Sequence, residues 1–306
     1  MKIMVFDVGG TEIKYSVMDE QMHRTKSGAV PTPQDTQAQF LDAVYRLYAP
    51  HKDEVTGIAM ALPGFVDNHT GYVSNGGALL YNTATPVGQL LAEKCSCPVI
   101  LENDCKAAAM AELANGALKG CCNAAVFIIG TGVGGGIIAN GQLVRGVHFT
   151  AGEYSFVNTN AEAWDAPDQN MACQCSTSNL LKWYRARKAL PEDAPLDGRS
   201  FFAAANAGEP EALEVLRRFC HAVAVQIYNL TVLLDVEKVA IGGGISKQPL
   251  LLESLRSAYD GLYASRAGQA YMEGLPRCQI VPCAFSSEAN QVGVAAAYFE
   301  AMQKKC

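Results

Sequence analysis

A short pattern of strand, glycine turn and strand occurs twice in this chain and constrains its fold more than any other feature. The first copy spans residues 3–18 and turns at Asp-Val-Gly-Gly-Thr, and the second spans residues 124–139 and turns at Gly-Thr-Gly-Val-Gly. Each copy begins with a continuously apolar run, which is typical of a strand buried on both faces. The copies lie about 120 residues apart, which indicates a weak internal duplication. The expected architecture is α/β, with two related lobes and a central cleft.

Apolar periodicity predicts the other elements. Helices are expected at residues 34–48, 87–93, 103–118, 178–188, 200–206, 211–234, 250–265 and 288–303, and strands at residues 24–30, 55–61, 98–101, 238–241 and 279–281. Residues 62–86 are rich in Gly, Asn and Thr and are expected to form a loop, whereas Asn140-Gly141 predicts a type I′ hairpin turn. The expected lobes are residues 1–118 with 288–306, and residues 119–287.

Composition argues against several classes of function. The chain has 306 residues, a formal net charge of −6 and no run of five or six Lys or Arg residues, so binding to nucleic acid or to a membrane surface is not expected. No apolar run reaches the ~18 residues of a membrane helix, and the apolar start is too short for a signal peptide. The 11 cysteines, an odd number, favour free thiols in a reducing compartment, and the cytoplasm is the expected location.

The two glycine turns are candidate phosphate-binding sites. Consecutive amides in such turns can form an anion-binding nest, and glycine lets a ligand approach the backbone closely. Either turn alone could be simple hairpin geometry, but two equivalent turns are better explained by one shared anion, such as the polyphosphate of ATP. The sequence has no G-x-x-x-x-G-K-[ST] P-loop. Gly130-x-Gly132-x-x-Gly135 matches the dinucleotide fingerprint, but that fingerprint requires a helix where residues 137–141 continue as strand and hairpin.

Charged residues near these turns are candidates for chemistry. Asp7 ends the first strand and could accept turn amides or hold Mg²⁺ through water, whereas Lys14 could be a solvated charge or a phosphate contact. Asp104 begins a helix, where capping alone would explain it, but a kinase also needs a carboxylate that takes the proton of the acceptor hydroxyl. Glu153 could be a surface acid or could accept bonds from two sugar hydroxyls. His148 is expected to be structural.

Several motifs follow one another along nearly the whole chain. They are Asp7–Lys14, Leu62–Gly64, Glu102–Asp104, Gly130–Gly135 and Ala151–Glu153. As an ordered set they resemble the ROK family of sugar kinases and sugar-responsive repressors. The resemblance implies the actin-like ATPase (ribonuclease H-like) fold and ATP-dependent phosphorylation of a hexose or hexose derivative, at the 6-hydroxyl as in a glucokinase. A β-glucoside, N-acylhexosamine or fructose kinase is an alternative, and a non-catalytic sugar sensor is an alternative of another class.

The resemblance also implies roles for individual residues. Mg²⁺ and the nucleotide would contact the two turns and a third glycine pair, namely Asp7, Gly9, Gly10, Thr11, Lys14, Gly130, Thr131, Gly132, Gly242 and Gly243. The sugar would contact Gly64, Asn103, Asp104 and Glu153, with Asp104 as the catalytic base. Repressor members carry an N-terminal helix-turn-helix segment, for which a strand that begins at Ile3 leaves no room. Relatives are commonly dimers, so a homodimer is expected.

The chain departs from the family pattern at two places. Phe156 stands where the family usually has a His shortly after Ala-Gly-Glu. Cys173-Gln174-Cys175 keeps the opening of the family zinc motif, but the third Cys is absent and Lys182 stands where a sugar-binding Glu is expected. Two thiols do not make a structural zinc site, so no zinc is expected. Because the missing His and Glu usually lie at the reducing end of the sugar, substituted hexoses such as β-glucosides are an alternative to free glucose.

Overall fold

The computed structural model describes residues 1–303, which form two compact units. Unit 1 comprises Met1–Gly116, Arg145–Ala151 and the chain from Ser287 onward, and unit 2 comprises Ala117–Val144 and Gly152–Ser286. The short segment 145–151 packs with unit 1, whereas the sequence pattern assigned it to the other lobe. The last residues of the expected first lobe, 304–306, lie outside the described residues.

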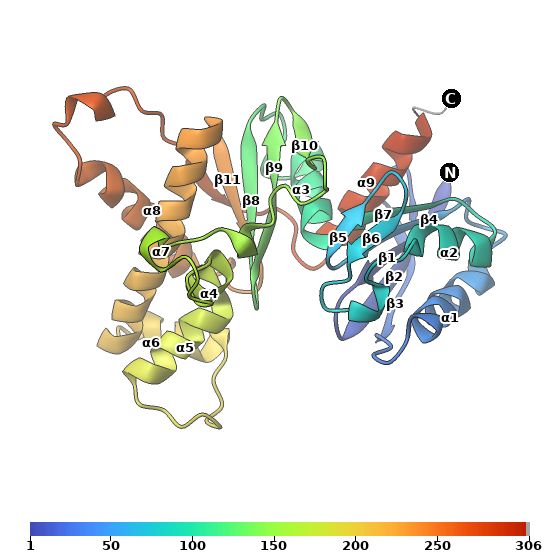
Figure 1. Cartoon of the computed structure of the whole chain (residues 1–306), viewed down its shortest axis with the longest axis horizontal. Coiled ribbons are helices and arrows are strands. Elements are labelled where there is room, and N and C mark those ends of the chain that lie inside the picture. The colour runs from blue at the N-terminus through green and yellow to red at the C-terminus, as the bar shows by residue number, and fades with distance from the viewer. Residues whose placement is uncertain (304–306) are drawn as a thin grey trace. The chain divides into compact units, whose positions relative to one another are not determined.

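Unit 1 contains a five-stranded sheet in the order β3-β2-β1-β4-β7 (Figure 1). Its strands are β1 (Lys2–Val8), β2 (Glu12–Asp19), β3 (Arg24–Pro31), β4 (Ile58–Leu62) and β7 (Val99–Asn103). β1 runs antiparallel to β2 and parallel to β4, which in turn runs parallel to β7. The carboxyl ends of β1, β4 and β7 therefore lie at the same edge of this sheet.

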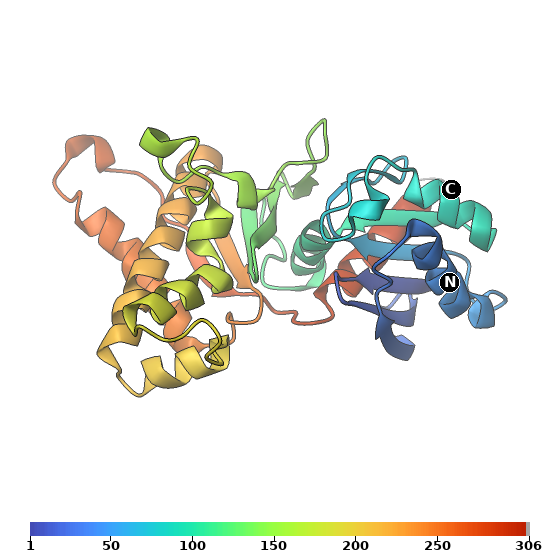
Figure 2. The same cartoon turned by 60° about the horizontal axis from the view of Figure 1, so that its bottom comes forward.

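Helices cover both faces of the unit 1 sheet (Figure 2). They are α1 (Gln37–Tyr48), α2 (Val87–Cys95), α3 (Asp104–Asn115) and α9 (Ala289–Gln303). α1 and α2 form an apolar cluster with Met4, Phe6 and Val8 of β1. α9 packs against β1, β4 and α3, and side chains of a strand alternate between the two faces. The apolar side chains of β1 therefore pack against helices on both faces of the sheet, as its continuous apolar run predicted.

The stretch 62–86 is not the simple loop that its composition predicted. It contains two short antiparallel strands, β5 (Phe65–Asp67) and β6 (Tyr72–Asn75). The side chain of Asp67 accepts two backbone N–H groups of the intervening turn, which stabilises the reversal of the chain. Each strand contributes a single buried valine. Two apolar residues among many Gly and Asn residues are too weak a pattern to predict a hairpin.

Unit 2 contains a second five-stranded sheet, in the order β10-β9-β8-β11-β12. Its strands are β8 (Ala124–Ile129), β9 (Val133–Ala139), β10 (Gln142–Val144), β11 (Lys238–Gly242) and β12 (Gln279–Pro282). Asn140 and Gly141 both have positive φ, 52° and 71°, which confirms the predicted type I′ turn. Strand order and strand directions are the same as in unit 1. The internal duplication that the sequence indicated is therefore a duplication of a whole sheet.

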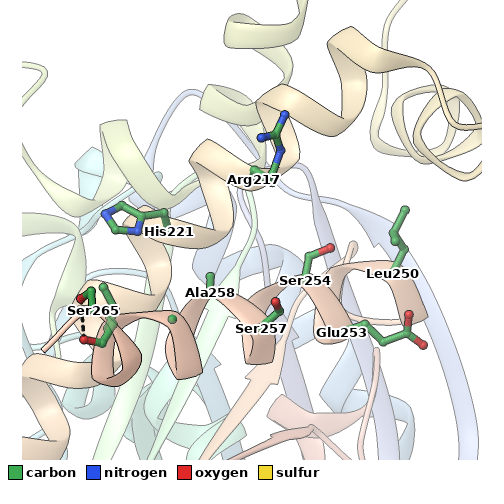
Figure 3. A pocket seen from close by; sticks show the side chains of 10 residues that line it. Arg217, His221, Leu250, Glu253, Ser254, Ser257, Ala258 and Ser265 are labelled. Atoms are coloured by element: carbon green, nitrogen blue, oxygen red, sulfur yellow. Dashed lines mark hydrogen bonds between the residues drawn. The ribbon is translucent and has the colours of Figure 1, made fainter. Parts of the chain in front are cut away.

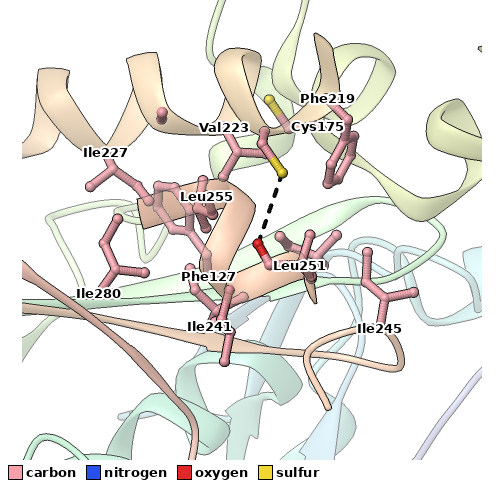
Figure 4. Close-up of a cluster of buried hydrophobic side chains, with 14 of the residues drawn as sticks. Phe127, Cys175, Phe219, Val223, Ile227, Ile241, Ile245, Leu251, Leu255 and Ile280 are labelled. Atoms are coloured by element: carbon pink, nitrogen blue, oxygen red, sulfur yellow. Dashed lines mark hydrogen bonds between the residues drawn. The ribbon is translucent and has the colours of Figure 1, made fainter. Parts of the chain in front are cut away.

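The helices of unit 2 pack on one face of its sheet. They are α4 (Met171–Cys175), α5 (Thr177–Arg187), α6 (Gly198–Asn206), α7 (Pro210–Leu234) and α8 (Pro249–Ala264). α7 and α8 contribute Phe219 and Leu251 to a buried cluster with Phe127 of β8 and Ile241 of β11 (Figure 4). Each such side chain stabilises the fold by about 1.5–3 kcal/mol relative to exposure.

Short 3₁₀ turns connect several of these elements, at Ala49–His51, Leu80–Asn82, Tyr154–Phe156, Ala161–Ala163 and Ala270–Met272. Within residues 1–303 no helix combines the length and the apolar character that a membrane crossing needs.

Candidate active site

The first glycine turn joins β1 to β2 and is closed by a hydrogen bond from the Gly9 N–H to the Glu12 carbonyl at 2.9 Å. Its other carbonyl oxygens are bound by the segment that follows β3. The bonds run from Thr32 Oγ1 to Gly9 O (2.8 Å), from Thr32 N to Thr11 O (3.0 Å) and from Gln34 Nε2 to Gly10 O (2.7 Å). Because these carbonyls already accept protein donors, the turn is left to offer its amide side to a ligand, which favours an anion.

Asp7 lies on β1 just before this turn and is 8% exposed. Its Oδ1 accepts a hydrogen bond from Asn290 Nδ2 of α9 at 2.9 Å. Burial raises the pKa of Asp7 above its usual value, while the Asn290 bond and the charge of Lys14 act in the opposite direction. Lys14 lies directly opposite Asp7 on β2, so both side chains leave the sheet on the same face.

We expect Asp7→Asn to stabilise the protein near neutral pH, because it removes a buried charge and retains an oxygen that can accept the Asn290 bond. Because the pKa of Asp7 is higher in the folded protein than in the unfolded chain, protonated Asp7 contributes its full share of the free energy of unfolding below the unfolded-state pKa. This contribution is lost as the pH rises through the folded-state pKa. In thermal unfolding, the variant should therefore melt above the wild type at about pH 7 and close to it at about pH 4. A difference in melting temperature that is equal at both pH values would contradict the raised pKa.

Asn103 and Asp104 lie where β7 ends and α3 begins. Asn103 is the N-cap of α3: its Oδ1 accepts the Lys106 N–H at 3.0 Å, and its Nδ2 donates to the Gly64 carbonyl at 2.9 Å. Asp104 is the first residue of the helix, is partly exposed, and accepts the Cys105 N–H at 2.7 Å. Gly64 has a φ of +96°, which favours glycine. The structure thus brings together three predicted sugar-binding residues, Gly64, Asn103 and Asp104.

The predicted nucleotide and sugar residues of unit 1 share one edge of its sheet. Asp7 pairs with Ala61 of β4, and Ala61 pairs with Glu102 of β7. Neighbouring strands are about 4.8 Å apart, so the backbones of Asp7 and Glu102 lie about 10 Å apart across the sheet. Open α/β sheets bind ligands at the carboxyl ends of their parallel strands. Both groups of residues therefore lie where such a fold places its ligands.

The second glycine turn joins β8 to β9. Gly130 donates its N–H to Gly132 O at 3.0 Å, and its carbonyl accepts the N–H of Thr177, at the start of α5, at 2.8 Å. A methyl group on Gly130 would meet no heavy atom within 4 Å, and φ at Gly130 is outside the left-handed region. Nothing in the described protein requires glycine there, which is the situation expected where a ligand approaches the backbone. Thr131 between the two glycines is exposed.

The glycine pair at 242 and 243 ends β11 beside the end of β8. A methyl group on Gly243, whose φ is +95°, would lie 2.1 Å from the Ile129 carbonyl, and one on Gly242 would lie 2.6 Å from Ile128 Cδ1. Backbone packing within unit 2 therefore requires glycine at 243, whereas at 242 the added methyl group would meet only side chains. Gly243 lies against Ile129, the residue that precedes Gly130. Contact with adenosine stays a prediction.

Glu153 begins a 3₁₀ turn next to Gly152, whose φ is +80°. Glu153 is partly exposed, and its carbonyl accepts the Phe156 N–H at 3.2 Å. The Phe156 side chain is 70% exposed. His148 is also exposed and makes no hydrogen bond or ion pair with the residues that the structure describes. Its structural role stays a prediction.

Two features of this site were missed by sequence reasoning. Thr32 and Gln34 bind the carbonyls of the first turn, and their only signal is that they follow closely on the third strand. Asn290 binds Asp7 from 283 residues away, and no motif links the two positions. Hydrogen bonds of this kind depend on tertiary packing and leave no local pattern.

The Cys-x-Cys pair lies on α4. Cys175 is buried in the core of unit 2, and burial raises its pKa to about 12, so it is a neutral thiol. Metal binding needs the thiolate. Cys173 contacts the Pro167 carbonyl at 3.6 Å, and Lys182 is exposed on α5. In the part of the chain that the structure describes, no group of three or more His, Cys, Asp or Glu side chains could hold a metal ion. The absence of zinc stays a prediction.

A surface groove of about 710 Å³ lies between α7 and α8 (Figure 3). Arg217 and His221 line it from α7, and Glu253 and Ser257 line it from α8. None of the predicted site residues lies in this groove.

Two sheets of the same strand order, each with a glycine turn after its first long strand, define the actin-like ATPase fold. Solved structures agree over almost the whole chain. A ROK family protein from Streptococcus pneumoniae, in complex with sucrose, is 27% identical with a TM-score of 0.87 and covers 99% of this chain and 100% of its own. A ROK family glucokinase from Streptomyces griseus, in complex with glucose and AMPPNP, is 25% identical with a TM-score of 0.79 and covers 97% and 99%.

The chain belongs to the ROK family, whose model matches residues 3–303. A β-glucoside kinase from Listeria innocua is 31% identical over 258 residues, which are 84% of this chain and 87% of that protein. The family and the fold predicted from the motifs are thereby confirmed.

Proposed function

We propose that this protein is an ATP-dependent sugar kinase that phosphorylates a hexose or hexose derivative at its 6-hydroxyl. The observation that carries the proposal is the position of Asp104, a partly exposed carboxylate at the sheet edge that also bears the first glycine turn. Sugar kinases among the relatives support the same reading. The homodimer and the cytoplasmic location stay predictions.

The nucleotide would be bound through the two glycine turns. The amide side of the first turn suits a phosphate, because the carbonyls of residues 9–11 are engaged by protein donors. Gly130 leaves open space for a second phosphate contact. Gly242 and Gly243 would contact the adenosine. Mg²⁺, when bound, would neutralise the charge that develops on the transferred phosphoryl group.

Asp7 fits the role of an acid that holds Mg²⁺ through water. Its carboxylate lies next to the first turn, and its hydrogen bond from Asn290 fixes its orientation. Magnesium favours carboxylate oxygens and keeps several waters, so one such acid together with substrate phosphates is a sufficient protein contribution. Lys14, on the same face, would contact a phosphate as a point charge.

Asp104 would take the proton from the sugar hydroxyl as that oxygen attacks the γ-phosphorus, while the bond between this phosphorus and the β–γ bridging oxygen breaks and ADP leaves. General-base help of this kind contributes about 10²–10⁴ in rate. Asn103 and Glu153 would bind other hydroxyls and hold the sugar in line for attack. Asn103 caps α3 and also binds the Gly64 carbonyl. These two bonds would hold Asp104, Asn103 and Gly64 in fixed positions relative to one another.

Two residues, Phe156 and Lys182, favour substituted hexoses as the substrate class. Phe156 replaces a family His and is 70% exposed, and Lys182 replaces a family Glu and is exposed on α5. An exposed aromatic ring can stack on an apolar group attached to the anomeric carbon. The similarity to a β-glucoside kinase agrees with this choice. Free glucose and N-acylated hexosamines are the competing substrates.

The test is a coupled assay of ADP release across free and 1-substituted hexoses. We expect release with at least one hexose and a higher kcat/KM for β-glucosides than for glucose. A higher kcat/KM for free glucose would overturn the substituted substrate class. If no sugar gives release above the background of ATP hydrolysis, the kinase assignment fails and a non-catalytic sugar-binding protein is the better description.

A further inference from the structure

A partly buried ion pair in unit 1 joins Glu102, the last residue but one of β7, to Arg145. Arg145 Nε donates to Glu102 Oε2 at 2.8 Å, and the side chains are 25% and 1% exposed respectively. Within the described residues Arg145 is the cation paired with this carboxylate. Burying a carboxylate is costly unless it is both paired with a cation and hydrogen-bonded. Arg145 therefore compensates the burial of the Glu102 charge and holds that side chain in place.

The second oxygen of Glu102 controls the turn that carries the proposed base. Glu102 Oε1 accepts the backbone N–H of Asn103 at 3.0 Å. Asn103 caps α3, and Asp104 is the first residue of that helix. One carboxylate therefore connects Arg145 on one side with the peptide immediately before Asp104 on the other. Capping explains why Asn103 is polar, but it does not explain a buried Glu102 paired with Arg145 behind the cap.

Arg145 also begins the segment 145–151, which packs in unit 1 and leads directly into Gly152 and Glu153. The Arg145 carbonyl accepts the Ala151 N–H at 3.2 Å, which closes the segment on itself. Arg145 Nη2 contacts Met110 Sδ of α3 at 3.4 Å, and the Phe149 and His69 rings form a T-shaped contact with centroids 5.7 Å apart. The segment is thus fixed to unit 1 at both Arg145 and Phe149.

We propose that Arg145 and Glu102 are positioning residues for the sugar. Through its side chain Arg145 fixes the turn that carries Asn103 and Asp104, and through its backbone it fixes the chain two residues before Glu153. The roles of Asp104 and Glu153 rest on the proposed kinase function, whereas the coupling of the two segments does not. Loss of the pair should therefore affect sugar kinetics far more than ATP kinetics.

The first experiment compares Arg145→Met with the wild type on the best sugar found. A displacement of about 1 Å at reacting groups can cost about 10²-fold, so we expect kcat/KM for the sugar to fall by about that factor and KM for ATP to change less than about twofold. The matched control is Arg187→Met, because Arg187 Nε pairs with Glu214 Oε2 at the same 2.8 Å but in an exposed setting. The control should retain wild-type kinetics. Equal effects on sugar and ATP would overturn the proposal.

A double variant separates positioning from stability. Arg145→Met leaves a buried unpaired carboxylate and should lower Tm by on the order of 10 °C, whereas Glu102→Gln with Arg145→Met removes that charge and should recover most of the loss. If the pair positions the sugar residues, the double variant should keep the reduced kcat/KM for sugar. Recovery of both Tm and kcat/KM would show that the pair is only a structural support.

Amide hydrogen exchange of the ligand-free protein tests the coupling without any substrate. Arg145→Met should speed exchange at residues 102–106 and at residues 146–153 together, and leave the turn at residues 130–134 unchanged. Unchanged exchange in either of the first two segments would overturn the coupling. If the wild type phosphorylates no sugar but exchange changes as expected, the kinase assignment fails and the coupling stands.

Discussion

Replacing Asp104 with asparagine should reduce sugar phosphorylation by about 10²–10⁴-fold and leave ATP binding nearly unchanged. Asparagine has the shape of aspartate and an oxygen that can accept the Cys105 N–H, but it cannot take a proton from the sugar hydroxyl. Losing one negative charge at the start of α3 costs about 0.3–1 kcal/mol, too little to unfold the protein. The measurement is ADP release at saturating ATP and sugar, combined with calorimetric titration of ATP.

Asp197→Asn is the matched control for this change. Asp197 caps α6 and accepts the Ser200 N–H at 2.8 Å, so it is also an acid at a helix N-terminus, but it lies outside the proposed site. Asparagine caps helices about as well as aspartate, and this variant should retain wild-type rate and stability. If Asp104→Asn keeps more than about a tenth of the wild-type rate, Asp104 is not the base.

Gly130→Ala should change stability and nucleotide binding in opposite directions. The added methyl group meets no protein atom within 4 Å and φ is not left-handed, so the fold should tolerate it and gain about 0.4–1 kcal/mol from a less flexible unfolded chain. The same methyl group would stand where we propose that a phosphate approaches the backbone. Hydrogen bonds to charged groups are worth about 1.5–3 kcal/mol, so KM for ATP should rise by about tenfold to a hundredfold.

Gly261→Ala provides the comparison for Gly130→Ala. Gly261 lies in α8, and a methyl group there also meets no heavy atom within 4 Å. Alanine in place of a helical glycine should raise Tm, and KM for ATP should stay at the wild-type value. Tm is measured by thermal unfolding, and KM for ATP is measured from initial rates over a range of ATP concentrations. An unchanged KM for ATP in Gly130→Ala would show that no phosphate approaches this turn.

Local chemistry explains why much of the fold could be predicted from the sequence. The apolar run at the start of the chain and the Asn140-Gly141 pair act through backbone sterics and burial, and both are found as predicted. The two sheets have the same order because the same local pattern occurs twice. The hairpin within residues 62–86 was missed because one buried valine per strand gives no periodicity.

The candidate site could be predicted only where its residues are neighbours in sequence. The turn at Asp7 and the helix start at Asp104 are local motifs, and the structure places both at one sheet edge. The long-range bonds beside them come from Asn290, which binds Asp7, and from Arg145, which binds Glu102, and both lie far away along the chain. None of Gly9, Gly10, Gly130 and Gly132 has a positive φ, so the backbone angles of the two turns do not by themselves require glycine. Their conformation depends on neighbouring donors such as Thr32, which sequence alone does not connect to the turn.

The bond between Asn290 and Asp7 has a consequence for how the protein is made. During translation the first strand emerges from the ribosome long before α9 does, and the two partners are 283 residues apart. Nascent chains that end before α9 lack the donor that orients Asp7 and also lack a helix that covers the unit 1 sheet. Synthesis therefore delays completion of the site that we propose for the nucleotide until nearly all of the described chain exists.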